Sequence, residues 1–317
     1  MWLIPKFTSM GERMKQAKKY YGVIPPIITP VDENERVDEA GFRKLLEHCV
    51  EKGLHGIFVA GTNGETMALT QVERNRAIKI ALDQVKGRVP VLCGVMDSGT
   101  GRVIDNIKAL EQMGGACAVI TSIFYARHTS QNETIRHFER ISRETALDLV
   151  IYNMPSMTGI TLSAETVIAI AEFDHVCAYK DSSGDFPGFL KVLEKFRCTP
   201  FSCLQGITSL AVPALLMGAD GFVPALGPLF PEIFTGAFQA VGQKNSELEK
   251  AWLWDKLIGE TSKILSLSKN QTASAKCAIA SLGFTDARVL MPQDGVSPEE
   301  KQAILARIEK IRQLPLI

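Results

Sequence analysis

Short apolar runs alternate with amphipathic stretches along most of this chain, beginning near residue 23. The runs are bounded by glycine, proline and polar turns, which is typical of buried strands. We predict strands at 23–29, 56–60, 89–94, 117–121, 148–152, 176–179, 201–204 and 220–223. Between them, apolar positions recur with the period of a helix. We predict helices at 38–52, 70–86, 100–113, 131–146, 163–172, 186–196 and 207–217.

Eight strands separated by helices predict parallel β–α–β units, and eight units are the number that closes a TIM barrel. From residue 231 onward only helical patterns remain, at 231–242, 245–267, 272–282 and 298–311. The first of these can serve as the eighth barrel helix, and the others would form a C-terminal helical appendage. The prediction is therefore an α/β protein with a (β/α)8 barrel. A doubly wound open sheet is the alternative, but no Gly-x-Gly-x-x-Gly follows the first strand.

The pattern divides the chain into an N-terminal arm at 1–20, a catalytic barrel at 21–243 and a helical region at 244–317. Basic and acidic residues number 35 each, so no net charge directs the protein to nucleic acid or to an anionic membrane. The most apolar stretch, 211–230, is about long enough to span a bilayer. Because it contains Asp220, three prolines and three glycines, we interpret it as helix, strand and loop inside a core.

The cysteines and histidines indicate neither disulfides nor a metal site. There are seven cysteines and no Cys-x-x-Cys pair, a pattern that favours a reducing compartment. The first five residues are interrupted by Pro5, too early for a signal sequence, so we expect a cytoplasmic protein. The five histidines show no His-Glu-x-x-His or similar spacing, and we therefore expect no metal.

The sixth apolar run, 176–179, ends on Lys180, which a Ser/Gly turn then follows. An ammonium group where an apolar strand stops is partly removed from water, which disfavours its charged form and lowers its pKa. The neutral amine is a nucleophile that can form a Schiff base with a carbonyl group. A lone lysine at a strand end more often extends into solvent, so this interpretation depends on the other strands.

Polar clusters follow three further strands at the same end, where the chemistry of such barrels is found. After the second strand, residues 61–65 read GTNGE, a tight turn whose backbone N–H groups can hold a carboxylate. Phe124 and Tyr125 follow the fourth strand, and the fifth strand ends with Tyr152, which can shuttle protons. Each cluster alone is as often ordinary turn or rim packing. All four on one face of one barrel are far less expected by chance.

These motifs, with residues 152–155 (YNMP), 179–184 (YKDSSG) and 218–221 (GADG), resemble the dihydrodipicolinate synthase / N-acetylneuraminate lyase family of pyruvate-dependent class I aldolases. The resemblance runs from about residue 21 to residue 316. It implies a barrel lyase that acts on small molecules and needs no cofactor beyond a covalent imine with its own lysine. The motifs are specific for the family and much less so for the substrate.

The resemblance implies a division of labour among the matching residues. Lys180 would condense with the ketone of pyruvate or of a longer 2-oxo acid. Tyr152 would relay protons with Thr62 as its hydrogen-bonded partner, and Thr62 and Asn63 would hold the carboxylate. Tyr125 resembles the tyrosine that family members insert into a neighbouring subunit's site, which implies a homotetramer built from tight dimers.

We also expect Met157, Gly206 and Thr208 to line the substrate site. Three departures from the family pattern, at Asn63, Met157 and residues 207–209, bear on specificity. Met157 stands where a dihydrodipicolinate synthase has an arginine for the carboxylate of its second substrate, a contact worth ~2–3 kcal/mol. After Gly206, residues 207–209 replace the acidic residues with which sialic acid lyases and sugar-acid aldolases bind polyol chains. Asn63 stands where many members have Thr or Ser, but the family's hydroxyoxoglutarate aldolases also have Asn.

We therefore predict a lyase that forms a Schiff base at Lys180 and cleaves or builds a carbon–carbon bond next to a pyruvyl unit. The favoured substrate is a hydroxyoxoglutarate or a 2-keto-3-deoxy acid. Dihydrodipicolinate (4-hydroxy-tetrahydrodipicolinate) synthase is the first alternative, and a dehydratase or deaminase is another. A catalytically silent paralogue that binds a 2-oxo acid is the alternative of a different class. If a second carboxylate is bound, Arg127 and His128 are the first cations to consider.

Overall fold

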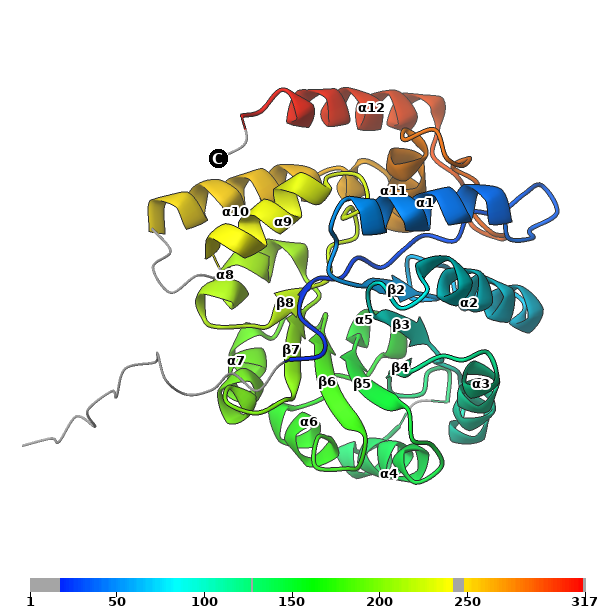
Figure 1. The fold of residues 1–317 in the computed structure, drawn as a ribbon, viewed down its shortest axis with the longest axis vertical. Coiled ribbons are helices and arrows are strands. Elements are labelled where there is room, and N and C mark those ends of the chain that lie inside the picture. The colour runs from blue at the N-terminus through cyan, green and yellow to red at the C-terminus, as the bar shows by residue number, and fades with distance from the viewer. Residues whose placement is uncertain (1–17, 127, 242–247, 316–317) are drawn as a thin grey trace, which may run out of the picture.

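The computed structural model describes residues 18–126, 128–241 and 248–315. Eight parallel strands form one sheet in the order β1-β8-β7-β6-β5-β4-β3-β2, with helices around it (Figure 1). The strands are β1 (Gly22–Val23), β2 (Ile57–Val59), β3 (Val91–Gly94), β4 (Cys117–Ile120), β5 (Asp148–Asn153), β6 (Val176–Asp181), β7 (Ser202–Gln205) and β8 (Gly221–Phe222).

The sheet closes on itself between its two end strands, β1 and β2. Just beyond β1, Pro26 forms a parallel bridge with Phe58, and the N–H of Ile27 donates to the carbonyl of Phe58 at 2.9 Å. The fold is therefore a (β/α)8 barrel with additional C-terminal helices, and the alternative of an open sheet is wrong.

Helices alternate with the strands, except that two short helices follow β5 (Figure 1). They are α1 (Glu39–Glu51), α2 (Gln71–Val85), α3 (Thr100–Gln112), α4 (Gln131–Ser142), α5 (Pro155–Thr158), α6 (Ala164–Ile170), α7 (Phe186–Phe196), α8 (Ala211–Leu216) and α9 (Pro231–Val241). The chain continues through α10 (Leu248–Ser262), α11 (Gln271–Ala280) and α12 (Pro298–Arg312), and α10 packs beside α9. In the described part of the chain, no helix is long and apolar enough to cross a membrane.

Several boundaries differ from the predicted ones. The predicted strand 23–29 is only two residues long, and the predicted helix 207–217 is a short 3-10 turn (Thr208–Leu210) followed by α8. The helix α5, just after β5, was not predicted. Most of the predicted arm at 1–20 lies outside the described residues. Its last residue, Tyr20, is buried, and its hydroxyl donates to Asp148 at 2.6 Å.

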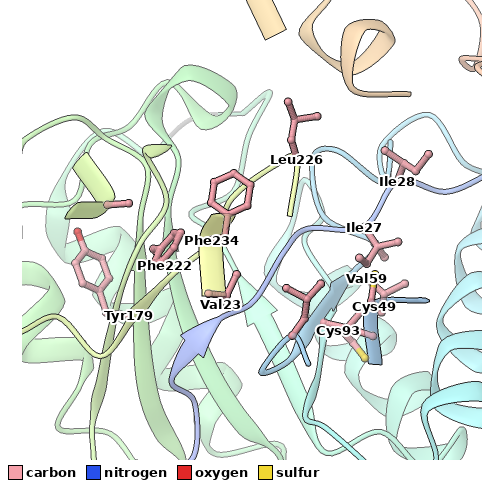
Figure 2. Close-up of a cluster of buried hydrophobic side chains, with 14 of the residues drawn as sticks. Val23, Ile27, Ile28, Cys49, Val59, Cys93, Tyr179, Phe222, Leu226 and Phe234 are labelled. Carbon is pink, nitrogen blue, oxygen red and sulfur yellow. The ribbon is translucent and has the colours of Figure 1, made fainter. Parts of the chain in front are cut away.

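Side chains along each strand alternate between two cores, and this alternation positions the site. Outward-facing Val59, Tyr179 and Phe222 belong to the layer between strands and helices, where Phe234 of α9 also lies (Figure 2). Inward-facing residues of neighbouring strands, including Val150 and Ala178, form a separate core inside the barrel. Because the side chains of a strand alternate with a period of two residues, the positions two residues after Val150 and Ala178 also face inward. Those positions are occupied by Tyr152 and Lys180.

Candidate active site

Lys180 and Tyr152 are direct neighbours on adjacent strands, near the carboxyl ends of β6 and β5. The Lys180 Nζ lies 3.9 Å from the centre of the Tyr152 ring and 4.7 Å from the centre of the Phe58 ring. The lysine is 5% exposed, although it borders a cavity. Lys180 pairs in register with both Tyr152 of β5 and Leu204 of β7. It therefore lies within β6, which extends one residue beyond it.

The two groups change each other's ionisation. Burial lowers the pKa of Lys180, while the oxygen of Tyr152 acts in the opposite direction. Burial alone would raise the pKa of Tyr152. The nearby lysine charge and hydrogen bonds with Thr62, Lys180 and Ser182 outweigh burial, so that the pKa of this phenol lies below its ordinary value. The pair thus combines an amine that loses its proton readily with a phenol that can give and take one.

The turn at residues 61–65 brings Thr62 and Asn63 to the same cavity. It follows β2, and hydrogen bonds from Gly64 N to Gly61 O at 3.1 Å and from Glu65 N to Thr62 O at 3.0 Å fix its shape. The Asn63 Nδ2 is buried and has no hydrogen-bond partner among the residues that the structure describes. A buried amide donor without a partner costs free energy, and a ligand with acceptor oxygens would satisfy it.

Gly206 allows the ends of β6 and β7 to approach closely. Its N–H donates to Asp181 O at 2.6 Å, and a Cβ at this position would overlap the Ser182 Oγ. Behind it, the buried Asp181 carboxylate accepts hydrogen bonds from Tyr179 at 2.8 Å and from Asn153 at 3.1 Å. These hydrogen bonds therefore hold the end of β6, which carries Lys180 and is followed by Ser182.

The cavity has a volume of about 840 Å³, much more than a three-carbon acid requires. One part of its wall comes from the barrel: Pro26, Thr62, Asn63, Tyr152, Met154, Ser156, Met157, Lys180, Ser182, Gly206, Ile207, Thr208, Ser209, Val223 and Ala225. The other part comes from the C-terminal region: Ser262, Leu265, Ser266, Lys269, Asn270, Gln271, Thr272 and Gln293. The described lining therefore contains two lysines and no carboxylate. No cluster of His, Cys, Asp and Glu suited to a metal ion occurs in the described residues.

A smaller recess of about 210 Å³ shares Thr62, Tyr152 and Met157 with the main cavity. Its remaining lining combines apolar residues, including Phe124, with polar ones, including Glu65. Tyr125 lines neither space: it is 96% exposed, in a left-handed backbone conformation with φ of 69°.

The structure therefore brings together seven of the eight residues singled out from the sequence, all except Tyr125. Sequence reasoning missed the contribution of Phe58, Ser182 and the segment that begins at Ser262. Ser182 was part of the YKDSSG motif but was interpreted only as a turn residue. The polar run just before the predicted helix 272–282 was the available signal for the C-terminal part of the wall. Of the cations considered for a second carboxylate, His128 lines neither space, and Arg127 lies outside the described residues.

Comparisons with known proteins agree with this arrangement. A family model described as the Dihydrodipicolinate synthetase family matches residues 19–311. The 4-hydroxy-tetrahydrodipicolinate synthase of Methanopyrus kandleri is 28% identical over 298 residues, 93% of this chain and 97% of that protein. A DapA-like lyase of Halobacterium salinarum, itself named as uncharacterized, is 30% identical over 286 residues, 90% of this chain and 92% of its own. YagE of E. coli K12, a prophage protein of the dihydrodipicolinic acid synthase family, shares the fold, with a TM-score of 0.87 and 24% identity over 93% of this chain and 99% of YagE.

Proposed function

This chain belongs to the dihydrodipicolinate synthetase family, whose members are Schiff-base-forming lyases, and we propose that Lys180 is the residue that forms the imine. The observation that carries this proposal is the burial of the Lys180 amine against the Tyr152 ring at the edge of a large cavity. Burial lowers the pKa of Lys180 and so favours its neutral amine, which is the form of the side chain that attacks a ketone.

The proposed reaction begins with attack of the neutral Lys180 amine on the C2 ketone of a 2-oxo acid. Tyr152 donates a proton to the departing hydroxyl, so that water leaves and a protonated imine and a phenolate remain. In cleavage, the phenolate takes the proton of the C4 hydroxyl, the C3–C4 bond breaks, and its electrons reach the imine nitrogen to give an enamine. The aldehyde leaves, Tyr152 protonates C3, and water hydrolyses the imine and returns the last proton to the phenolate.

The same residues serve condensation in the opposite order. Thr62 supports the proton relay through its hydrogen bond with Tyr152. Thr62 and Asn63 hold the carboxylate of the 2-oxo acid, which gives the buried Asn63 Nδ2 an acceptor. No cofactor is needed, since the covalent imine itself is the electron sink.

For the second half of the substrate, we favour a hydroxyoxoglutarate or a 2-keto-3-deoxy acid. The exposed Met157 supplies no charge at the position implied for the second carboxylate of a synthase. The second candidate is 4-hydroxy-tetrahydrodipicolinate synthase, which the name of the Methanopyrus kandleri relative supports. In either case the protein would act in the cytoplasm, a proposal that its seven free cysteines support.

We also propose that the active form is a homotetramer of tight dimers in which Tyr125 acts in the neighbouring subunit. Its nearly complete exposure supports this, as does the recess beside Thr62 and Tyr152 in which a phenol could be placed. Tyr125 also has a left-handed backbone, and strained conformations of this kind are concentrated at functional sites.

The test is reduction of the imine with borohydride in the presence of pyruvate, followed by peptide mapping. We expect one reduced pyruvyl group on Lys180 and no label in Lys180→Ala, whose fold should remain intact. A label on another lysine, or no label with any of several 2-oxo acids, would refute the proposed mechanism. A coupled assay for pyruvate release from a panel of 2-oxo acids then separates the aldolase from the synthase.

A further inference from the structure

A buried ion pair connects the turn at residues 61–65 to the C-terminal helices. The Lys276 ammonium of α11 contacts the Glu65 carboxylate, and their side chains are 0% and 1% exposed. The other oxygen of Glu65 accepts the N–H of Leu290 at 2.9 Å, and Lys276 also donates to the carbonyl of Arg288 at 2.7 Å. Glu65 is thus bound to two separate segments of the C-terminal region.

Both members of this pair are close in sequence to residues of the main cavity. Glu65 is three residues after Thr62 and two after Asn63, and its own N–H closes the turn on Thr62 O. Lys276 is on the same helix as Gln271 and Thr272, which line the cavity from the C-terminal side. The ion pair therefore links the two parts of the wall.

Stability alone does not explain a charged link at this place. Removing two charges from water costs about as much as their attraction returns, and apolar residues of similar volume often serve stability equally well. An ion pair with additional hydrogen bonds is instead directional, because both groups must keep their geometry. Glu65 also has a left-handed backbone with φ of 53°, so the chain is held in a conformation that it would not adopt freely.

We infer that Glu65 and Lys276 are positioning residues that hold Thr62 and Asn63 at the correct place for the carboxylate of the 2-oxo acid. This inference rests on the proposed function of the turn. It also makes the C-terminal helices part of the binding site, since they add Lys276 and the Leu290 N–H to the barrel's own contact with the turn, a hydrogen bond from Thr29 to Gly64 O at 2.8 Å.

The test separates positioning from stability by comparing single and double variants. Lys276→Met leaves a buried carboxylate unpaired and should lower Tm by roughly 5–15 °C. Glu65→Met with Lys276→Met removes both charges and should recover part of that loss, because the Leu290 N–H and the Arg288 carbonyl still lose their partners. We expect the double variant still to require at least ~10-fold more pyruvate for half-maximal borohydride trapping at Lys180, because the turn is no longer held in place. A double variant with the half-saturating concentration of the wild type, whatever its stability, would overturn the inference.

The control is Arg307→Met, which breaks an ion pair with Glu260 at 2.7 Å in the same helical region, and neither of these two residues lines the cavity. It should leave the pyruvate dependence unchanged. Hydrogen exchange gives a readout that needs no substrate: the amides of Gly64, Glu65 and Thr66, all bonded within the turn, should exchange at least ~10-fold faster in the double variant and not in Arg307→Met. Unchanged exchange would contradict the inference, whereas absence of trapping in the wild type would contradict only the proposed function.

Discussion

Lys180 illustrates how a residue can be placed for chemistry at a cost to stability. Its ammonium is buried against two aromatic rings, and no carboxylate occurs among the described residues that line its cavity. The folded protein therefore holds a proton on this amine less well than the unfolded chain does. The same burial that favours the neutral, nucleophilic amine must destabilise the folded protein at any pH at which the amine is charged.

The first prediction follows from the lowered pKa of Lys180 in the folded state. Because the pKa of Lys180 is lower in the folded state than its ordinary 10.5, the unfolded state binds more protons between the two values, and stability rises with pH across that interval. Lys180→Met should therefore raise Tm at pH 7 by at least ~2 °C, and the gain should fade as the pH approaches 10.5. Thermal melts of both proteins between pH 7 and 10.5 measure it. A variant less stable than the wild type at pH 7 would contradict the prediction.

The second prediction concerns the hydroxyl of Tyr152. Tyr152→Phe keeps the ring that packs against Lys180 but removes the proton relay, so turnover should fall ~10²–10⁴-fold while a 2-oxo acid still binds. Tyr20→Phe is a matched control, because Tyr20 is also buried in the core inside the barrel, but its hydroxyl donates to Asp148 and it does not line the cavity. Near-normal turnover in Tyr152→Phe would assign the relay to another residue.

The third prediction concerns recognition of a second carboxylate. The wild type should use aspartate semialdehyde at least ~10²-fold less well, in kcat/KM, than its best aldehyde, because Met157 supplies no guanidinium. Met157→Arg should raise that activity. Met67→Arg should not, since Met67 is similarly exposed but lines only the smaller recess.

If the wild type instead prefers aspartate semialdehyde, the structure indicates which cation to test. Lys269 lines the main cavity, whereas His128 does not. Lys269→Gln should then raise KM for aldehydes with a distal carboxylate and leave KM for pyruvate unchanged.

At the scale of elements, the short apolar runs of the sequence were sufficient to predict eight strands, although not the length of β1. They also predicted Tyr152 and Lys180 at the ends of neighbouring strands, because the end of an apolar run is a local property. The role of α11 could not be predicted in this way. Its residues approach the turn at 61–65 only through contacts between segments more than 200 residues apart, such as the ion pair between Lys276 and Glu65. No local pattern encodes a contact of that kind.

The start of α11 provides the fourth prediction. The Asn270 side chain accepts the N–H groups of Thr272 at 3.0 Å and Ala273 at 3.2 Å, and its Nδ2 donates to Gln293 at 2.9 Å. Asn270→Ala should cost ~1 kcal/mol of stability through the lost cap. Because Asn270, Thr272 and Gln293 all line the cavity, it should also raise KM for the complete substrate.

A second N-cap in the same region supplies the control for this effect. Ser297 caps α12 by accepting the N–H of Glu300 at 3.1 Å, and it does not line the cavity. Ser297→Ala should lose a similar amount of stability with no change in KM. Equal KM changes in the two variants would mean that α11 has no special role at the site.

At the scale of the whole molecule, we propose that the barrel at 21–243 and the helical region at 244–317 form one catalytic unit. Both contribute to the wall of the main cavity, and the buried pair of Glu65 and Lys276 joins them. Removing the helical region should therefore expose the turn as well as the cavity. The remaining question is whether one chain is sufficient, since Tyr125 is almost fully exposed and lines neither of the two cavities described above.

The last prediction tests that question by complementation. If Tyr125 acts in a neighbouring subunit, Tyr125→Ala has an intact Lys180 but lacks its neighbour's phenol, and Lys180→Ala has the phenol but lacks the nucleophile. Each variant alone should lose at least ~10² in turnover. After random exchange of subunits between equal amounts of the two variants, half of the dimers are mixed. One of the two sites in each mixed dimer is complete, so activity should return to about a quarter of the wild-type value.

The control is a mixture of Lys180→Ala with Tyr152→Phe, which should remain inactive because those two residues must come from the same chain. Native mass spectrometry verifies that subunits have exchanged. Mixed dimers without recovered activity would contradict a role of Tyr125 across the interface, and a monomer that is fully active would exclude the interface from the reaction altogether.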